Sequence, residues 1–87
     1  MIFTVYSREA CHLCQEMIQA LQCLQKDKAF EFEIVDIDTK PELEERYGTK
    51  IPVLVSQADN TEICHYHLNM SALDAYFASF MPGNGHN

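Results

Sequence analysis

The 87-residue chain is long enough for one domain, and its 47% hydrophobic and 22% charged residues are ordinary for a compact globular protein. A net charge of −7, with six Lys and Arg residues that do not cluster, argues against nucleic-acid binding, which depends on cations that neutralise phosphates. No segment approaches the ~20 apolar residues of a membrane span, and Met1 leads straight into an apolar stretch rather than a signal peptide, so we expect a cytoplasmic protein that binds neither nucleic acid nor membrane.

Hydrophobic periodicity and turn-forming residues predict alternating strands and helices. In chain order we expect a strand at 2–6, a helix at 11–25, a strand at 30–37, a short helix ending at Gly48, strands at 51–55 and 61–66, and a last helix to about Phe80. The two strands at 51–66 form a hairpin across a turn at 57–60. The first helix presents an apolar stripe of Ala10, Cys14, Met17, Ile18, Leu21 and Leu24.

The later helices carry signals for where they begin. Asp38 or Thr39 can cap the short helix, which has Pro41 in its first turn. Ser71 with Asp74 three residues later resembles a capping box for the last helix. Capping is therefore the role expected of Asp38.

The element order β-α-β-α-β-β-α predicts an α/β fold. A right-handed crossover makes the first two strands a parallel pair, and the hairpin adds two antiparallel strands. The result is a mixed four-stranded sheet with helices on both faces, which resembles a minimal thioredoxin-like arrangement. We expect the domain to span residues 1–81 and residues 82–87 to form a disordered tail.

The sequence Cys11-His12-Leu13-Cys14 stands where the first strand gives way to the first helix. At the helix start, the Cys11 sulfur faces unpaired backbone N–H groups and the positive end of the helix dipole. Such surroundings lower a cysteine pKa from about 8.5 into a range of ~3.5–7.5. Cys14 lies in the apolar stripe and should be more buried. We therefore expect Cys11 to attack a disulfide and Cys14 to resolve the mixed disulfide.

A metal site is the competing use of these side chains. The candidate ligands are Cys11, Cys14, Cys64, His65 and His67. There is no second paired-ligand motif, and alternation along a strand puts His65 and His67 on one face and Cys64 on the other, so we expect no metal within one chain. Cys23 lies ~18 Å along the helix from Cys11 and is expected to be an exposed free thiol. A cluster bridging two subunits and a non-catalytic binding module remain alternatives.

Residues 1–80 resemble the glutaredoxin family in the strand–CxxC–helix unit, the Ile51-Pro52 step and the element order. The resemblance implies that Pro52 is cis and lies against the dithiol, and that Ile51 offers its backbone N–H and C=O to the substrate. The run Val35–Asp38 is more similar to the poorly characterised glutaredoxin-like branch of the family. Asp36 is expected only to be solvated at the end of its strand.

Four further side chains are expected to contact the substrate. Arg8 matches a position where glutaredoxins often carry a cation for the carboxylate of glutathione, and Lys50 could act in the same way. Either cation could also stabilise the Cys11 thiolate, or be a solvated surface charge. His12, if protonated, would stabilise the thiolate as well, so His12→Ala should raise the pKa of Cys11 and lower the reduction potential. Leu13 lies beside it between the two cysteines.

Glutaredoxins bind glutathione with a Gly-Gly-plus-acid segment after the proline strand, and the corresponding residues 61–68 contain no glycine. The resemblance therefore supports dithiol chemistry better than glutathione specificity. We expect no tightly bound cofactor and leave glutathione open as the reductant. The expected partner of this monomer is a disulfide-containing protein or a small-molecule thiol.

Overall fold

The computed structural model describes residues 1–79. Its elements are β1 (Ile2–Ser7), α1 (His12–Leu24), β2 (Glu31–Asp36), the 3₁₀ turn η1 (Ile37–Thr39), α2 (Pro41–Tyr47), β3 (Val53–Ser56), β4 (Glu62–His65) and α3 (Met70–Ser79). The predicted α/β element order is confirmed, while the end of the last helix and the 82–87 tail lie outside the described residues. None of the helices in this described part is long and apolar enough to cross a membrane.

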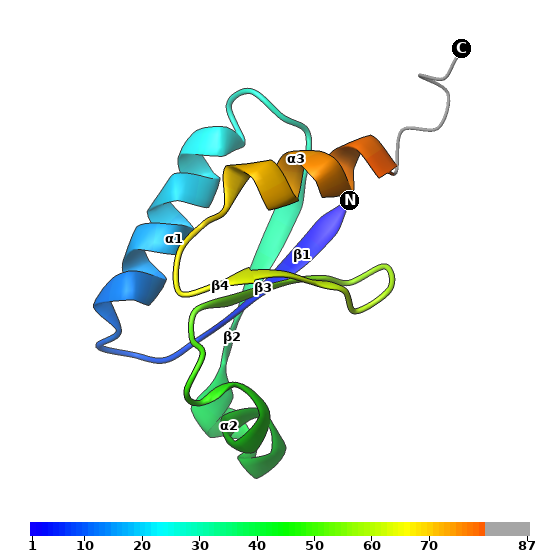
Figure 1. Ribbon diagram of the computed structural model, residues 1–87. Coiled ribbons are helices and arrows are strands. Elements are labelled where there is room, and N and C mark those ends of the chain that lie inside the picture. Colours follow the sequence, from blue (N-terminus) through cyan, green and yellow to red (C-terminus); the bar gives the residue numbers. More distant parts are fainter. Residues whose placement is uncertain (80–87) are drawn as a thin grey trace.

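The four strands form one mixed sheet in the order β2-β1-β3-β4. β1 runs parallel to β2, with Ile2 opposite Glu31, and antiparallel to β3, with Tyr6 opposite Val53. β4 pairs antiparallel with β3 and completes the predicted hairpin. Figure 1 shows α1 and α3 beside the sheet and α2 at the end where β2 finishes. This topology brings the end of β1, the start of α1 and the start of β3 to one end of the molecule.

Alternation along β1 divides the two faces of the sheet. Phe3 and Val5 are fully buried in the core that α1 and α3 cover. Thr4 and Tyr6 point to the opposite face, where the Tyr6 ring stacks on Tyr47 of α2 with centroids 4.3 Å apart. Helices therefore lie on both faces, as predicted.

The apolar stripe of α1 packs against the core largely as predicted. Cys14, Met17 and Leu21 are buried, and the half-buried stripe residues Ile18 and Leu24 pack against the core cluster. Leu21 has no exposed surface, so its packing contributes directly to the stability of the domain.

Ala10 does not belong to this stripe. It precedes the helix, is exposed, and adopts a left-handed φ of 58°. The chain must turn sharply between the end of β1 and the start of α1, and this turn takes Ala10 off the helical face. The prediction for this residue was wrong.

The expected cap of the short helix was also wrong. The Asp36 carboxylate, expected only to be solvated, caps η1 by accepting the Asp38 N–H at 2.8 Å, and the Asp38 carboxylate binds Arg8 instead of capping a helix. η1 separates Asp38 and Thr39 from α2, and Lys40 becomes the N-cap without a side-chain hydrogen bond. Lys40 is extended because it precedes Pro41.

The last helix begins earlier than the capping box predicts. The Asn69 side-chain oxygen accepts the Ala72 N–H at 3.0 Å, and α3 starts at Met70. Asn is as good a cap as Ser, and here it comes first in the chain. Ser71 and Asp74 therefore lie inside the helix and do not cap it. The stop of α2 at Gly48 is confirmed, with its N–H donating to the Glu44 carbonyl at 2.8 Å.

Candidate active site at the start of the first helix

The N-cap of α1 is Cys11, which has an extended backbone with φ −104° and ψ 107°. Its Sγ accepts a hydrogen bond from the Cys14 backbone N–H at 3.2 Å. The two cysteines form a disulfide with their Cα atoms 5.2 Å apart. One of the predicted backbone donors therefore does face the Cys11 sulfur, at the end of the helix where the dipole favours an anion.

The two sulfurs differ in accessibility, as the sequence predicts. Cys11 is half-buried, whereas Cys14 is only 1% exposed and lies in the buried stripe with Met17 and Leu21. A molecule approaching from solvent therefore reaches Cys11 first. Cys14 is shielded from such a molecule by its burial.

The segment before β3 contains the predicted proline. The Ile51-Pro52 peptide bond is cis, which confirms that part of the prediction, and Pro52 is fully buried. Ile51 is half-buried. Within residues 1–79 neither the N–H nor the C=O of Ile51 has a backbone hydrogen-bond partner. Polar backbone groups normally have partners, so these two are available to an incoming chain.

Sequence reasoning missed Tyr66, which contacts the same segment. Its backbone N–H donates to the Pro52 carbonyl at 2.9 Å, and its phenol donates to the Thr49 carbonyl at 2.9 Å. Its φ is 67°, in the left-handed region that a bulky side chain rarely adopts. A left-handed residue is usually marked by Gly or Asn, and neither stands here.

Arg8 does not present a free charge to the cysteine pair. Its Nε lies 3.1 Å from both carboxylate oxygens of Asp38, and its Nη2 lies 3.2 Å from Glu44 Oε2. These bonds, led by the one to Asp38, raise the pKa of Arg8. The guanidinium ties the β1–α1 loop to η1 and α2, and two carboxylates balance its charge.

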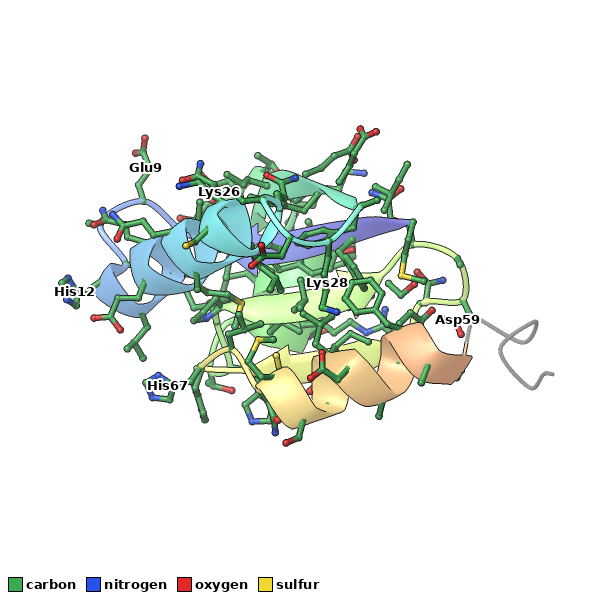
Figure 2. The ribbon with its side chains drawn as sticks, turned by 90° about the horizontal axis from the view of Figure 1, so that it is seen from above. Glu9, His12, Lys26, Lys28, Asp59 and His67 are labelled. Atoms are coloured by element: carbon green, nitrogen blue, oxygen red, sulfur yellow. A yellow bond between two sulfur atoms is a disulfide. The ribbon has the colours of Figure 1, made fainter. Side chains whose placement is uncertain are left out.

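His12 also has a carboxylate partner. Its imidazole is 83% exposed, and Nε2 lies 2.9 Å from Glu16 Oε2 on the next turn of α1. Figure 2 shows the His12 side chain pointing outward at the end of the molecule where α1 begins, with His67 at the same end. Leu13 is half-buried beside it. The imidazole therefore interacts with Glu16 and solvent.

Lys50 lies beside a different hollow. A cavity of about 350 Å³ on the Tyr6 face of the sheet is lined by Tyr6, Arg46, Tyr47, Lys50, Val55, Asn60 and Glu62. Neither cysteine of the disulfide is among these residues. The structure thus brings Cys11, Cys14, Ile51 and Pro52 to one end of the molecule but assigns Lys50 to the wall of this separate cavity.

The remaining cysteines stay outside the pair. Cys23 is an exposed free thiol, as predicted, and Cys64 is a buried one whose pKa is raised by that burial. β4 ends at His65, so His67 lies beyond the strand and the shared strand face expected for these histidines does not exist. No group of three metal-ligating side chains in the described range is arranged to hold an ion.

The fold and the disulfide define the class of protein: a thioredoxin-fold domain with a CxxC pair at the start of its first helix. The family follows from the sequence, because the profile of the glutaredoxin-like domain (DUF836) matches residues 3–78. The chain belongs to this glutaredoxin-like family, as the resemblance predicted.

Solved structures agree with this assignment. Protein Ne2328 from Nitrosomonas europaea is 43% identical, with a TM-score of 0.79 over 85% of this chain and 87% of that one. Protein XcR50 from X. campestris is 31% identical, with a TM-score of 0.67 over 88% and 96%. Thioredoxin 1 from Thermosipho africanus, at 16% identity and a TM-score of 0.63 over 94% and 100%, shows the common fold alone. No curated protein matches the chain.

Proposed function

We propose that the protein is a thiol–disulfide oxidoreductase in which Cys11 is the nucleophile and Cys14 the resolving thiol. The observation that carries the proposal is the unequal exposure of two bonded sulfurs at a helix start, with one half-buried and the other 1% exposed. A thiolate at a helix N-terminus is both a nucleophile and a good leaving group, which thiol–disulfide exchange requires.

In the reduced protein, the Cys11 thiolate attacks one sulfur of a substrate disulfide. A bond forms between Cys11 and that sulfur, and the other substrate sulfur leaves as a thiolate. Cys14 then loses its proton to solvent and attacks the Cys11 sulfur, which forms the Cys11–Cys14 disulfide and releases the second substrate thiolate. Two electrons pass from the protein dithiol to the substrate.

Ile51 is proposed to bind the substrate backbone. It precedes the buried Pro52, and its N–H and C=O have no backbone partner within residues 1–79. An extended segment beside the disulfide could pair with both groups, as a strand pairs with a sheet edge. The proposed substrate is therefore a disulfide in a polypeptide, with small disulfides reacting without this contact. We propose that no tightly bound cofactor takes part.

The proposal is tested with single-cysteine variants of the reduced protein mixed with oxidised insulin. Cys14→Ser should accumulate a covalent mixed disulfide, because the resolving thiol is gone. Cys11→Ser should form none, and Cys23→Ser is the matched control that should react like the wild type. Trapping by Cys11→Ser through Cys14 would reverse the assigned roles. A wild type that leaves insulin oxidised would identify a binding module instead.

A further inference from the structure

Tyr66 adopts a backbone conformation that its side chain disfavours. Among residues 1–79, the non-glycine residues with positive φ are Ala10, Asn60 and Tyr66. Asn is well suited to the left-handed region and Ala is small, whereas Tyr is neither. Residues in such disfavoured conformations are often found at functional sites, where the surrounding structure holds them in place.

Core packing does not explain why this residue is a tyrosine. The side chain is 44% exposed and is not part of the buried cluster. Its ring meets the His65 ring edge-on, with centroids 4.6 Å apart. The backbone hydrogen bond from Tyr66 to Pro52 needs no particular side chain. The interaction that only tyrosine supplies is the phenol bond to the Thr49 carbonyl.

The two hydrogen bonds of Tyr66 hold both ends of one short segment. The Pro52 carbonyl accepts from its backbone and the Thr49 carbonyl from its phenol, each at 2.9 Å. Between these carbonyls lies Ile51, whose own N–H and C=O have no backbone partner in the described chain. On the other side, the Lys50 N–H donates to the Tyr47 carbonyl at 2.8 Å. The flanks of Ile51 are fixed while its polar groups stay free.

We propose that Tyr66 is a positioning residue that holds the segment from Thr49 to Pro52 so that Ile51 can pair with a polypeptide substrate. The inference rests on the proposed oxidoreductase function and adds a determinant of substrate class. A disulfide within a polypeptide uses the backbone contact at Ile51, whereas a small disulfide reaches Cys11 without it. Removing the phenol should therefore weaken reaction with the first and leave the second unchanged.

The test compares Tyr66→Phe with the wild type in single-turnover reactions of reduced protein. One substrate is oxidised insulin, and the other is bis(2-hydroxyethyl) disulfide. One hydrogen bond less in the segment should raise the half-saturating insulin concentration on the order of two- to tenfold, with little change in the saturating rate. The rate with the small disulfide and the Cys11–Cys14 reduction potential should not change. Tyr47→Phe is the matched control, because it removes a phenol but keeps the Tyr47 carbonyl that accepts from Lys50, and it should behave as wild type.

Tyr66→Asn is the second variant, because Asn accepts a left-handed φ and keeps the backbone bond while losing the ring and the phenol. It should show at least the insulin defect of Tyr66→Phe. Equal effects on both disulfides, or no effect on insulin in both variants, would overturn the inference and leave the proposed function intact. A wild type that reduces neither disulfide would overturn the proposed function and this inference with it.

Discussion

Alkylation of the reduced protein should distinguish its four cysteines by their positions in the fold. Cys11 is half-buried at the N-cap of α1, Cys23 is exposed, and Cys14 and Cys64 are buried. We expect iodoacetamide to modify Cys11 first, Cys23 second, and the buried pair only slowly. The order follows from two separate effects, thiolate stabilisation at the helix start and burial of the thiol.

The expected preference for Cys11 can be worked out from ionisation. An ordinary exposed thiol with a pKa of about 8.5 is ~3% ionised at pH 7 and ~0.3% at pH 6. A thiol held as thiolate therefore gains up to ~30-fold at pH 7 and ~300-fold at pH 6. A thiolate with a lower pKa is also a weaker nucleophile, which reduces this gain roughly tenfold. The remaining advantage over an ordinary thiol is up to about threefold at pH 7 and up to ~30-fold at pH 6.

The buried thiols are slowed for a different reason. Cys14 is 1% exposed and Cys64 9% exposed, and burial also raises the pKa of Cys64. Their modification requires local opening of the fold, which holds them back on the order of 100-fold or more when opening costs about 3 kcal/mol.

The assay is timed quenching of the reduced protein followed by peptide mass mapping, repeated at pH 6 and pH 7. The ratio of Cys11 to Cys23 modification should increase as the pH is lowered. A ratio that stays constant between these pH values would show that the start of α1 does not stabilise a thiolate. Modification of Cys64 as early as Cys23 would contradict the burial of β4 against α3.

Three further predictions concern the helices. His12→Ala should slow Cys11 alkylation at pH 6 by less than about threefold, because solvent screens an 83% exposed imidazole. Glu16→Gln should instead accelerate the alkylation. If both variants changed the alkylation rate in the same direction, the ion pair between His12 and Glu16 would be contradicted. Leu21→Ala should lower the free energy of unfolding by about 2–5 kcal/mol and the melting temperature by ~10–30 °C. Leu24 is only half-buried, so Leu24→Ala should lower both by less. Thermal unfolding followed by circular dichroism measures the difference. Asn69→Ala should lower the free energy of unfolding, measured in urea, by about 0.5–2 kcal/mol, and Ser71→Ala should change it very little. A larger loss for Ser71→Ala than for Asn69→Ala would show that Ser71 is the cap.

Local patterns were sufficient to predict the fold. The apolar stretch at residues 2–6 predicts a buried strand, and the helical spacing of Cys14, Met17 and Leu21 predicts one buried helix face; the sheet with α1 against it buries both. The helix starts were predicted less well. Several residues near each start can cap, and tertiary contacts decide which one does.

Tyr66 illustrates what a single sequence hides. Its two hydrogen bonds reach Thr49 and Pro52, 17 and 14 residues earlier in the chain, and its left-handed backbone has no Gly or Asn to mark it. Only the pairing of β3 with β4 brings this residue to the cis proline. The disulfide joins two cysteines within one helical turn, so their spacing in the sequence was enough to predict that they pair, whereas the contacts of Tyr66 join segments that are distant in the chain.

Contacts between distant elements also bear on the proposed reactivity of Cys11. The sequence offers Arg8, Lys50 and His12 as cations that could stabilise its thiolate, and Arg8 and His12 are close to it in the chain. In the structure, each of these two has a carboxylate within 3.2 Å, with Asp38 and Glu44 around Arg8 and Glu16 beside His12. A cation whose charge is balanced so closely by a carboxylate exerts a much smaller net field on other groups around it. In the proposed mechanism, we therefore expect the Cys14 backbone N–H, 3.2 Å from the Cys11 sulfur at the start of α1, to stabilise the thiolate more than either cation does.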